Sequence, residues 1–153
     1  ALGTDCIDKE VITEILDFGI NFTNDYEWSL NMCKLANDML LRQSKSKANN
    51  EFKLPNDSRV AFAIRAGLIE MCLDCIDRFL EEDISQQLGR NLSYILRKVH
   101  NVSFHWKTAK AIRSKRSTIE EKLVRLEQKS NIANNVKCKE LLDIVSSILN
   151  LNG

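Results

Sequence analysis

Apolar side chains recur at helical spacing through most of this 153-residue sequence, and few residues are available to reverse the chain sharply. The clearest stripe consists of Leu88, Leu92, Ile95 and Val99. The chain contains five glycines and one proline, which is too little turn chemistry for a many-stranded β fold. Because no segment alternates between apolar and polar residues as a strand does, we predict an all-α fold.

Start and stop signals divide the chain into about eight helices and one long polar loop. The predicted helices cover residues 5–18, 25–42, 58–66, 68–82, 84–100, 103–114, 118–130 and 135–150. Gly67 is expected to turn the chain between the third and fourth helices. Ser117 stands at capping-box spacing before Glu120, which predicts that a new helix starts there. Residues 43–57 are polar and are expected to form the loop.

Composition is that of a soluble globular protein, with 44% hydrophobic and 28% charged residues and a net charge of +1. This near balance of charge gives no overall attraction to nucleic acid or membrane. No apolar run approaches the roughly 18 residues of a membrane span, so we expect no membrane association.

We expect a single domain over residues 1–153. The missing initiator Met and the end within a helical pattern suggest a processed chain or a piece of a longer protein.

Cysteine usage favours an intracellular location, either cytoplasmic or nuclear. The five cysteines, an odd number, are scattered through helical patterns, as expected of reduced thiols. Four N-x-S/T sequons weigh weakly toward secretion; they begin at Asn21, Asn56, Asn91 and Asn101.

Residues 57–98 contain a three-helix unit: "DSRVAFAIRAG", then "LIEMCLDCIDRFL", then "EEDISQQLGRNLSYILRK". This unit resembles one armadillo repeat. In that family the short first helix ends in an Ala-Gly-like turn, matched here by Ala66-Gly67, and the third carries a pattern near A-L-x-N-L, matched by Arg90-Asn91-Leu92-Ser93. The resemblance implies a right-handed armadillo-like solenoid; a HEAT-type repeat and an irregular helical bundle are the alternatives.

In this register the flanks form partial copies of the unit. The divisions are a partial repeat 5–43, the loop 43–57, the repeat 57–98 and a degenerate repeat 103–150. Stacked units share a core, and the third helices (25–42, 84–100 and 135–150) would line a concave groove. In the armadillo family an asparagine there bonds the backbone of an extended peptide. That role would fall to Asn37 and Asn91, with Ser146 at the degenerate position; capping a local turn or facing solvent is the alternative for both asparagines.

Candidate chemical sites are few. Cys72 and Cys75, with His100 and His105, superficially resemble a zinc pattern, but the cysteines lie within a predicted helix and are expected to fill the core. The histidines flank a helix junction, where surface or capping roles are expected. The chain lacks G-x-S-x-G, a phosphate-binding glycine loop and H-E-x-x-H. We therefore expect no enzyme activity, no metal and no cofactor.

Charge clusters mark two helices. A group of carboxylates is expected to form the solvated face of helix 68–82 and its end: Glu70, Asp74, Asp77, Glu81, Glu82 and Asp83. Five cations without an intervening acid form a basic patch: Lys107, Lys110, Arg113, Lys115 and Arg116. This patch is expected either to be solvated or paired with the acidic helix, or to contact an acidic partner or nucleic acid.

Together these features predict a non-catalytic module that binds a protein, as a peptide or partner helix, along the groove. Self-association or docking onto the rest of a longer chain would cover apolar surface at the ends of a fragment. The alternative function is binding of nucleic acid or another polyanion through residues 107–116.

Overall fold

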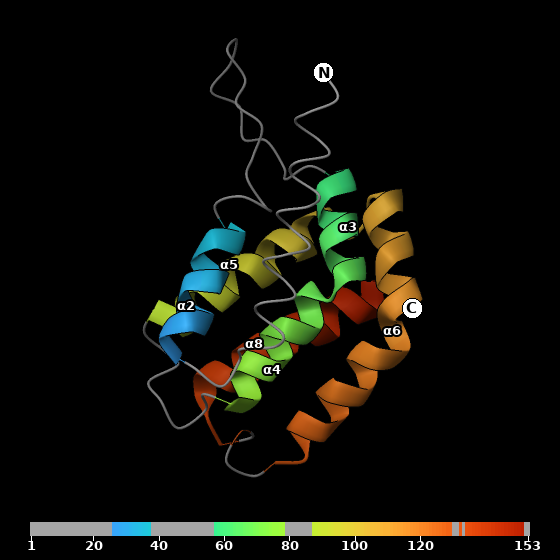
Figure 1. The fold of residues 1–153 in the computed structure, drawn as a ribbon. Helices are drawn as coiled ribbons and strands as arrows, with labels where there is room; N and C mark the ends of the chain where they lie inside the picture. Colours follow the sequence, from blue (N-terminus) through green and yellow to red (C-terminus); the bar gives the residue numbers. More distant parts are fainter. Residues whose placement is uncertain (1–25, 38–56, 79–86, 130–131, 133, 152–153) are drawn as a thin grey trace.

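The protein is all-helical in every part that the computed structural model describes, which confirms the predicted fold class (Figure 1). The described residues are 26–37, 57–78, 87–129, 132 and 134–151. The helices are α2 (Tyr26–Leu35), α3 (Asp57–Ala66), α4 (Leu68–Arg78), α5 (Gln87–Val102), α6 (Trp106–Glu127) and α8 (Val136–Leu151). The predicted helix 5–18, loop residues 43–56 and the carboxylates Glu81, Glu82 and Asp83 lie outside the described residues.

The predicted turn between α3 and α4 is confirmed at Gly67. This residue has φ 109°, a conformation that a side chain would disfavour. Its amide donates to the Ile64 carbonyl at 3.1 Å, and its own carbonyl accepts from the Met71 amide at 2.9 Å. The last turn of α3 and the first turn of α4 are therefore joined through one glycine.

Helix α6 is continuous where the sequence predicted two helices, 103–114 and 118–130, so that prediction is wrong. One buried apolar stripe runs through the expected break: Ile112, Ile119, Leu123 and Leu126. The Ser114 hydroxyl donates to the Ala111 carbonyl within the helix, at 2.7 Å, and so does not end it. Because no glycine or proline interrupts this stretch, burial of the stripe outweighs the local capping signal around Ser117.

The helices pack in two connected groups. Helix α2 packs on α5 and α5 packs on α8, so that the three predicted third helices are neighbours. Helix α6 contacts α3, α4 and α8, and Figure 1 shows its first turns beside α3. The predicted stripes of α5 and α8 are buried in the shared core, which the positions Leu92, Ile95, Leu141 and Val145 illustrate.

Asp57 ties the start of α3 to the start of α6. Its Oδ1 accepts a hydrogen bond from the Thr108 amide at 2.9 Å and another from the Thr108 hydroxyl. Thr108 is the third residue of α6, where an amide has no partner within the helix. The N-cap residue, His105, makes no side-chain capping bond, so a carboxylate distant in the sequence takes that role.

Cys33, Cys72 and Cys75 lie fully buried in the core, as predicted for the last two. A hydrogen bond with Cys75, and then burial, raises the pKa of the Cys33 thiol. Burial, and then the neighbouring Cys75, raises the pKa of Cys72. Burial alone raises the pKa of Cys138 to about 11. The thiols of Cys33, Cys72 and Cys138 therefore stay protonated in the folded protein at neutral pH.

These raised pKa values predict that the free energy of unfolding falls in mildly alkaline solution. Each thiol ionises in the unfolded chain at a pKa of about 8.5 but stays protonated when folded, so the unfolded state binds fewer protons as the pH rises. The loss approaches about 1.4 kcal/mol per pH unit per thiol above that value. Urea unfolding between about pH 8 and 9.5 measures it.

Cys138→Ala is the matched variant, because it removes one of these thiols from the core. We expect its free energy of unfolding to fall less steeply over the same pH range than that of the wild type. The difference in slope corresponds to one proton fewer released on unfolding. A wild-type stability that does not change with pH in this range would contradict the prediction.

Candidate functional site

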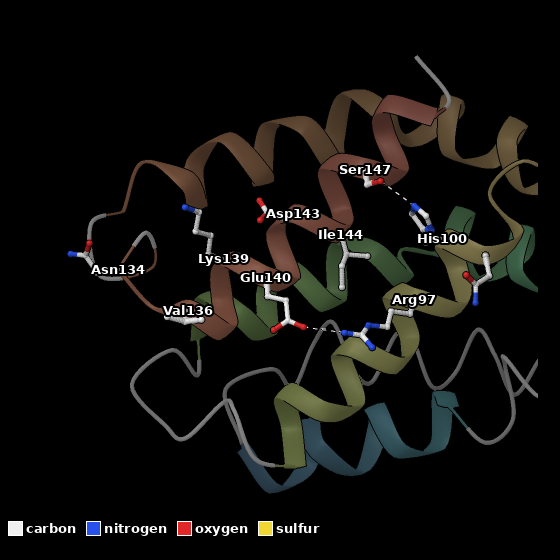
Figure 2. Close-up of a pocket in the computed structure, with 10 residues that line it drawn as sticks. Arg97, His100, Asn134, Val136, Lys139, Glu140, Asp143, Ile144 and Ser147 are labelled. Carbon is white, nitrogen blue, oxygen red and sulfur yellow. Dashed lines mark hydrogen bonds and ion pairs between the residues drawn. The ribbon is translucent and has the colours of Figure 1, made fainter.

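An open groove of about 990 Å³ lies between α5 and α8 (Figure 2). Both helices were predicted to line a binding surface, but the groove is formed by other residues than those predicted. Its lining residues are Arg97, His100, Asn101, Asn134, Val136, Lys139, Glu140, Asp143, Ile144 and Ser147. Cations, acids, amides and apolar side chains are thus mixed along one surface, which suits a polypeptide better than a uniformly charged ligand.

Two polar contacts join α5 to α8 along the groove (Figure 2). The Arg97 guanidinium and the Glu140 carboxylate form an ion pair at 3.0 Å. His100 Nε2 and Ser147 Oγ are hydrogen-bonded at 3.0 Å. These contacts hold the two walls of the groove in a fixed relation.

Apolar surface in the groove comes from α8. Val136, the first residue of this helix, is 84% exposed, and Ile144 is partly buried. Eight residues of helix separate them by about 12 Å, or slightly more than two turns. A partner segment therefore meets two apolar positions with charged side chains between them.

The His100–Ser147 pair does not have the geometry of a nucleophile and its base. Ser147 lies within α8, where the helix itself uses the backbone amides, so these amides are not free to stabilise an oxyanion. Within the described part of the chain, no carboxylate is hydrogen-bonded to His100 to orient its ring. The pair acts as a link between two helices.

Among the described residues, no three His, Cys, Asp or Glu side chains lie together as a group able to hold a metal ion. Cys72 and Cys75 are in the core of α4, whereas His100 faces the α5–α8 groove and His105 stacks against Phe104 with ring centroids 4.4 Å apart. The four residues of the superficial zinc pattern are therefore not assembled into one site.

Asn37 and Asn91, the two asparagines predicted to bind a peptide backbone, contact each other. Asn37 Nδ2 donates to the Asn91 carbonyl at 3.0 Å and to Asn91 Oδ1 at 3.1 Å. Asn91 Nδ2 donates in turn to the Gln87 carbonyl at 2.8 Å. These bonds join the chain after α2 to α5, while Asn37 Oδ1 is buried without a hydrogen-bond partner among the described residues. Binding of a peptide backbone by the two asparagines stays a prediction. Ser146 is half-buried on α8, and no hydrogen bond to either asparagine is present among the described residues.

The basic patch is divided by its own contacts. Lys115 pairs with Glu70 of α4 at 3.4 Å, and Arg116 pairs with Glu120 at 2.7 Å and donates to the Leu149 carbonyl. The expectation of pairing with the acidic helix is therefore confirmed for Lys115. Lys107, Lys110 and Arg113 make no ion pair with any described residue, and the last two are exposed.

The prediction that the carboxylates of α4 form a solvated face is wrong for Glu70, because its side chain is only 8% exposed. Glu70 begins a row of ion pairs between α4 and α6 that continues with Lys122–Asp74 at 2.8 Å and Lys129–Asp77. The sequence missed this row because the predicted break in α6 separated Lys115 from the other two lysines. The continuous helix α6 places Lys115 and Lys122 toward α4, and Lys129 follows just after its C-cap.

The residues of the α5–α8 groove carry no local signal that sequence reasoning had used. Arg97 and Glu140 lie 43 residues apart, and each by itself is an ordinary polar position on a helix.

Comparisons with protein-family models, curated proteins and solved structures gave no match. None of the helices within the described residues has the length and apolar character needed to cross a membrane.

Replacing Lys115 with Met should destabilise the protein more than replacing Lys129 with Met. The first change leaves the buried Glu70 carboxylate unpaired, which costs about 1–3 kcal/mol. The Lys129–Asp77 pair is more exposed, so its loss should cost less than about 1 kcal/mol. Urea unfolding of both variants measures the difference, and equal losses would show that burial of Glu70 does not govern the pair.

Asn37→Ala should lower the free energy of unfolding by about 1–2 kcal/mol, because it removes two hydrogen bonds to α5. Combining it with Asn91→Ala should cost less than the sum of the single changes, since both remove the same side-chain bond. A double-mutant cycle from urea unfolding tests this coupling. Strictly additive losses would argue against the contact between the two amides.

Proposed function

We propose that this protein is a non-catalytic protein-binding module, and that the groove between α5 and α8 receives a segment of its partner. The observation that carries the proposal is the exposure of Val136 in an open groove of about 990 Å³ that Ile144 also lines. Exposed apolar side chains surrounded by polar groups are typical of a protein-binding surface.

The distribution of charge in the groove favours a partner segment with both signs of charge. Arg97 and Lys139 supply positive charge, and Glu140 and Asp143 supply negative charge. The two apolar positions on α8 fit a partner helix with apolar side chains about two turns apart, near positions i and i+7. An armadillo-like solenoid is part of the proposal, supported by the order in which α2, α5 and α8 contact one another.

An intracellular location also belongs to this proposal. Its support is that Cys33, Cys72, Cys75 and Cys138 are buried as free thiols, the form that reducing compartments maintain.

Selection from a displayed library of random peptides tests the function. We expect the wild-type protein to enrich peptides with two apolar residues about seven positions apart. Val136→Lys should lose binding to the selected peptides by about tenfold or more, since it places a charge where an apolar anchor packs. Fluorescence anisotropy with labelled copies of those peptides measures the affinity.

Val124→Lys is the matched control, because Val124 is also exposed on a helix, at 52%, but lies on α6 outside the groove. It should bind the selected peptides as the wild type does. If light scattering finds a wild-type dimer that Val136→Lys dissociates, the partner is a second copy of this chain. Failure to enrich any peptide, together with a monomeric wild type, would contradict the proposed function.

A further inference from the structure

Two aromatic side chains are exposed at the turn between α5 and α6. Phe104 is 69% exposed and Trp106 is 68% exposed. Backbone bonds fix this turn: the Ser103 amide donates to the His100 carbonyl at 3.2 Å, and the His105 amide donates to the Val102 carbonyl at 3.0 Å. The rings are therefore presented to solvent by an ordered backbone.

A recess of about 280 Å³ adjoins Trp106, between α3 and the first turns of α6. Its lining residues are Ser58, Ala61, Phe62, Arg65, Trp106, Lys107 and Lys110. Three of these are cations and none is an acid. This recess shares no lining residue with the α5–α8 groove, where both charges occur.

The positive charge of this recess is not neutralised by the described residues. Lys107 Nζ donates to the Ser58 hydroxyl at 2.7 Å and lies 5.5 Å from the centre of the Trp106 ring, and neither contact supplies a negative charge. Arg65 and Lys110 are exposed and form no ion pair with a described residue. Asp57 is close in sequence, but its Oδ1 binds Thr108 and it does not line the recess.

We propose that this recess and the Trp106 ring that lines it form a binding surface for single-stranded nucleic acid, with Phe104 exposed on the turn just before Trp106. Unpaired bases stack on exposed aromatic rings, and phosphates are held by nearby cations. Here Trp106 offers the stacking ring, while Arg65 and Lys110 approach from two different helices and flank the path of the backbone. Two cations of the basic patch that form no ion pair with a described residue, Lys107 and Lys110, thus acquire a role outside the α5–α8 groove.

The shape of the surface favours a nucleic acid over other polyanions. A recess between two helices admits a flat base, whereas a bilayer surface would meet the exposed rings without entering the recess. An acidic peptide would satisfy the cations but leave two large rings exposed to water. Duplex nucleic acid satisfies the cations as well, but its paired bases are not available for stacking.

Fluorescence anisotropy with labelled oligo(dT) and oligo(U) of about twelve nucleotides tests the proposal, since sites of this kind cover ~4–16 nucleotides. We expect saturable binding by the wild type that weakens roughly tenfold to twentyfold between about 50 and 200 mM salt, as three phosphate contacts predict. Comparing the two oligonucleotides shows whether the 2′-hydroxyl contributes.

Variants separate stacking from charge. Trp106→Ala should weaken binding by roughly tenfold or more, whereas Trp106→Phe should retain most of the affinity because a ring remains. The double variant Lys107→Gln/Lys110→Gln should weaken binding and reduce the slope of its salt dependence by about two thirds. Thermal unfolding of each variant confirms that the fold is kept.

The matched control is Arg90→Gln/Tyr94→Ala, which removes a cation and a 50%-exposed ring from α5 away from the recess. It should bind as the wild type does. The proposal is overturned if neither oligonucleotide binds, if duplex DNA of the same length binds equally well, or if Trp106→Ala has no effect. Binding to vesicles of phosphatidylserine and phosphatidylcholine, or to poly-glutamate, without binding to either oligonucleotide would assign the surface to another partner.

Discussion

Burial of apolar side chains on both sides of the polar middle of α6 is the constraint on which the rest of this structure depends. Ile112, Ile119 and Leu123 are among these side chains, and α6 packs against α3, α4 and α8. Burying each such side chain contributes about 1.5–3 kcal/mol, whereas a capping bond that would end the helix contributes about 1 kcal/mol. The helix therefore continues through its polar middle. Its length brings the row of lysines to α4 and its first turns to α3.

The polar contacts between helices follow from that packing and give the two candidate surfaces different chemistry. Carboxylates of α4 neutralise two lysines further along α6: Glu70 pairs with Lys115, and Asp74 pairs with Lys122. The first turns have no such partners among the described residues, so positive charge remains beside exposed aromatic rings. Between α5 and α8 the signs of charge alternate and one ion pair joins the walls. These differences in charge are the reason that we propose a peptide as the ligand of the α5–α8 groove and an unpaired nucleic acid strand as the ligand of the recess beside Trp106.

The asparagine pair shows that two side chains predicted to occupy corresponding positions can contact each other. The sequence placed Asn37 and Asn91 on corresponding helices, and the structure does bring them together. They meet because α2 packs on α5. An amide both donates and accepts, so the same property that suits peptide binding also lets two amides bind each other.

Local periodicity by itself determined most of the helical segments and the buried stripes of α5 and α8, but not the continuity of α6 or the burial of Glu70. The stripes of α5 and α8, the buried Cys72 and the turn at Gly67 all follow from side-chain spacing and backbone sterics within a few residues. Tertiary packing decided which polar side chains meet. Asp57 reaches Thr108 over 51 residues and Asn37 reaches Asn91 over 54. Periodicity fixes the face that a helix buries but not its neighbour or crossing angle, and those set the contacts from which both surfaces are built.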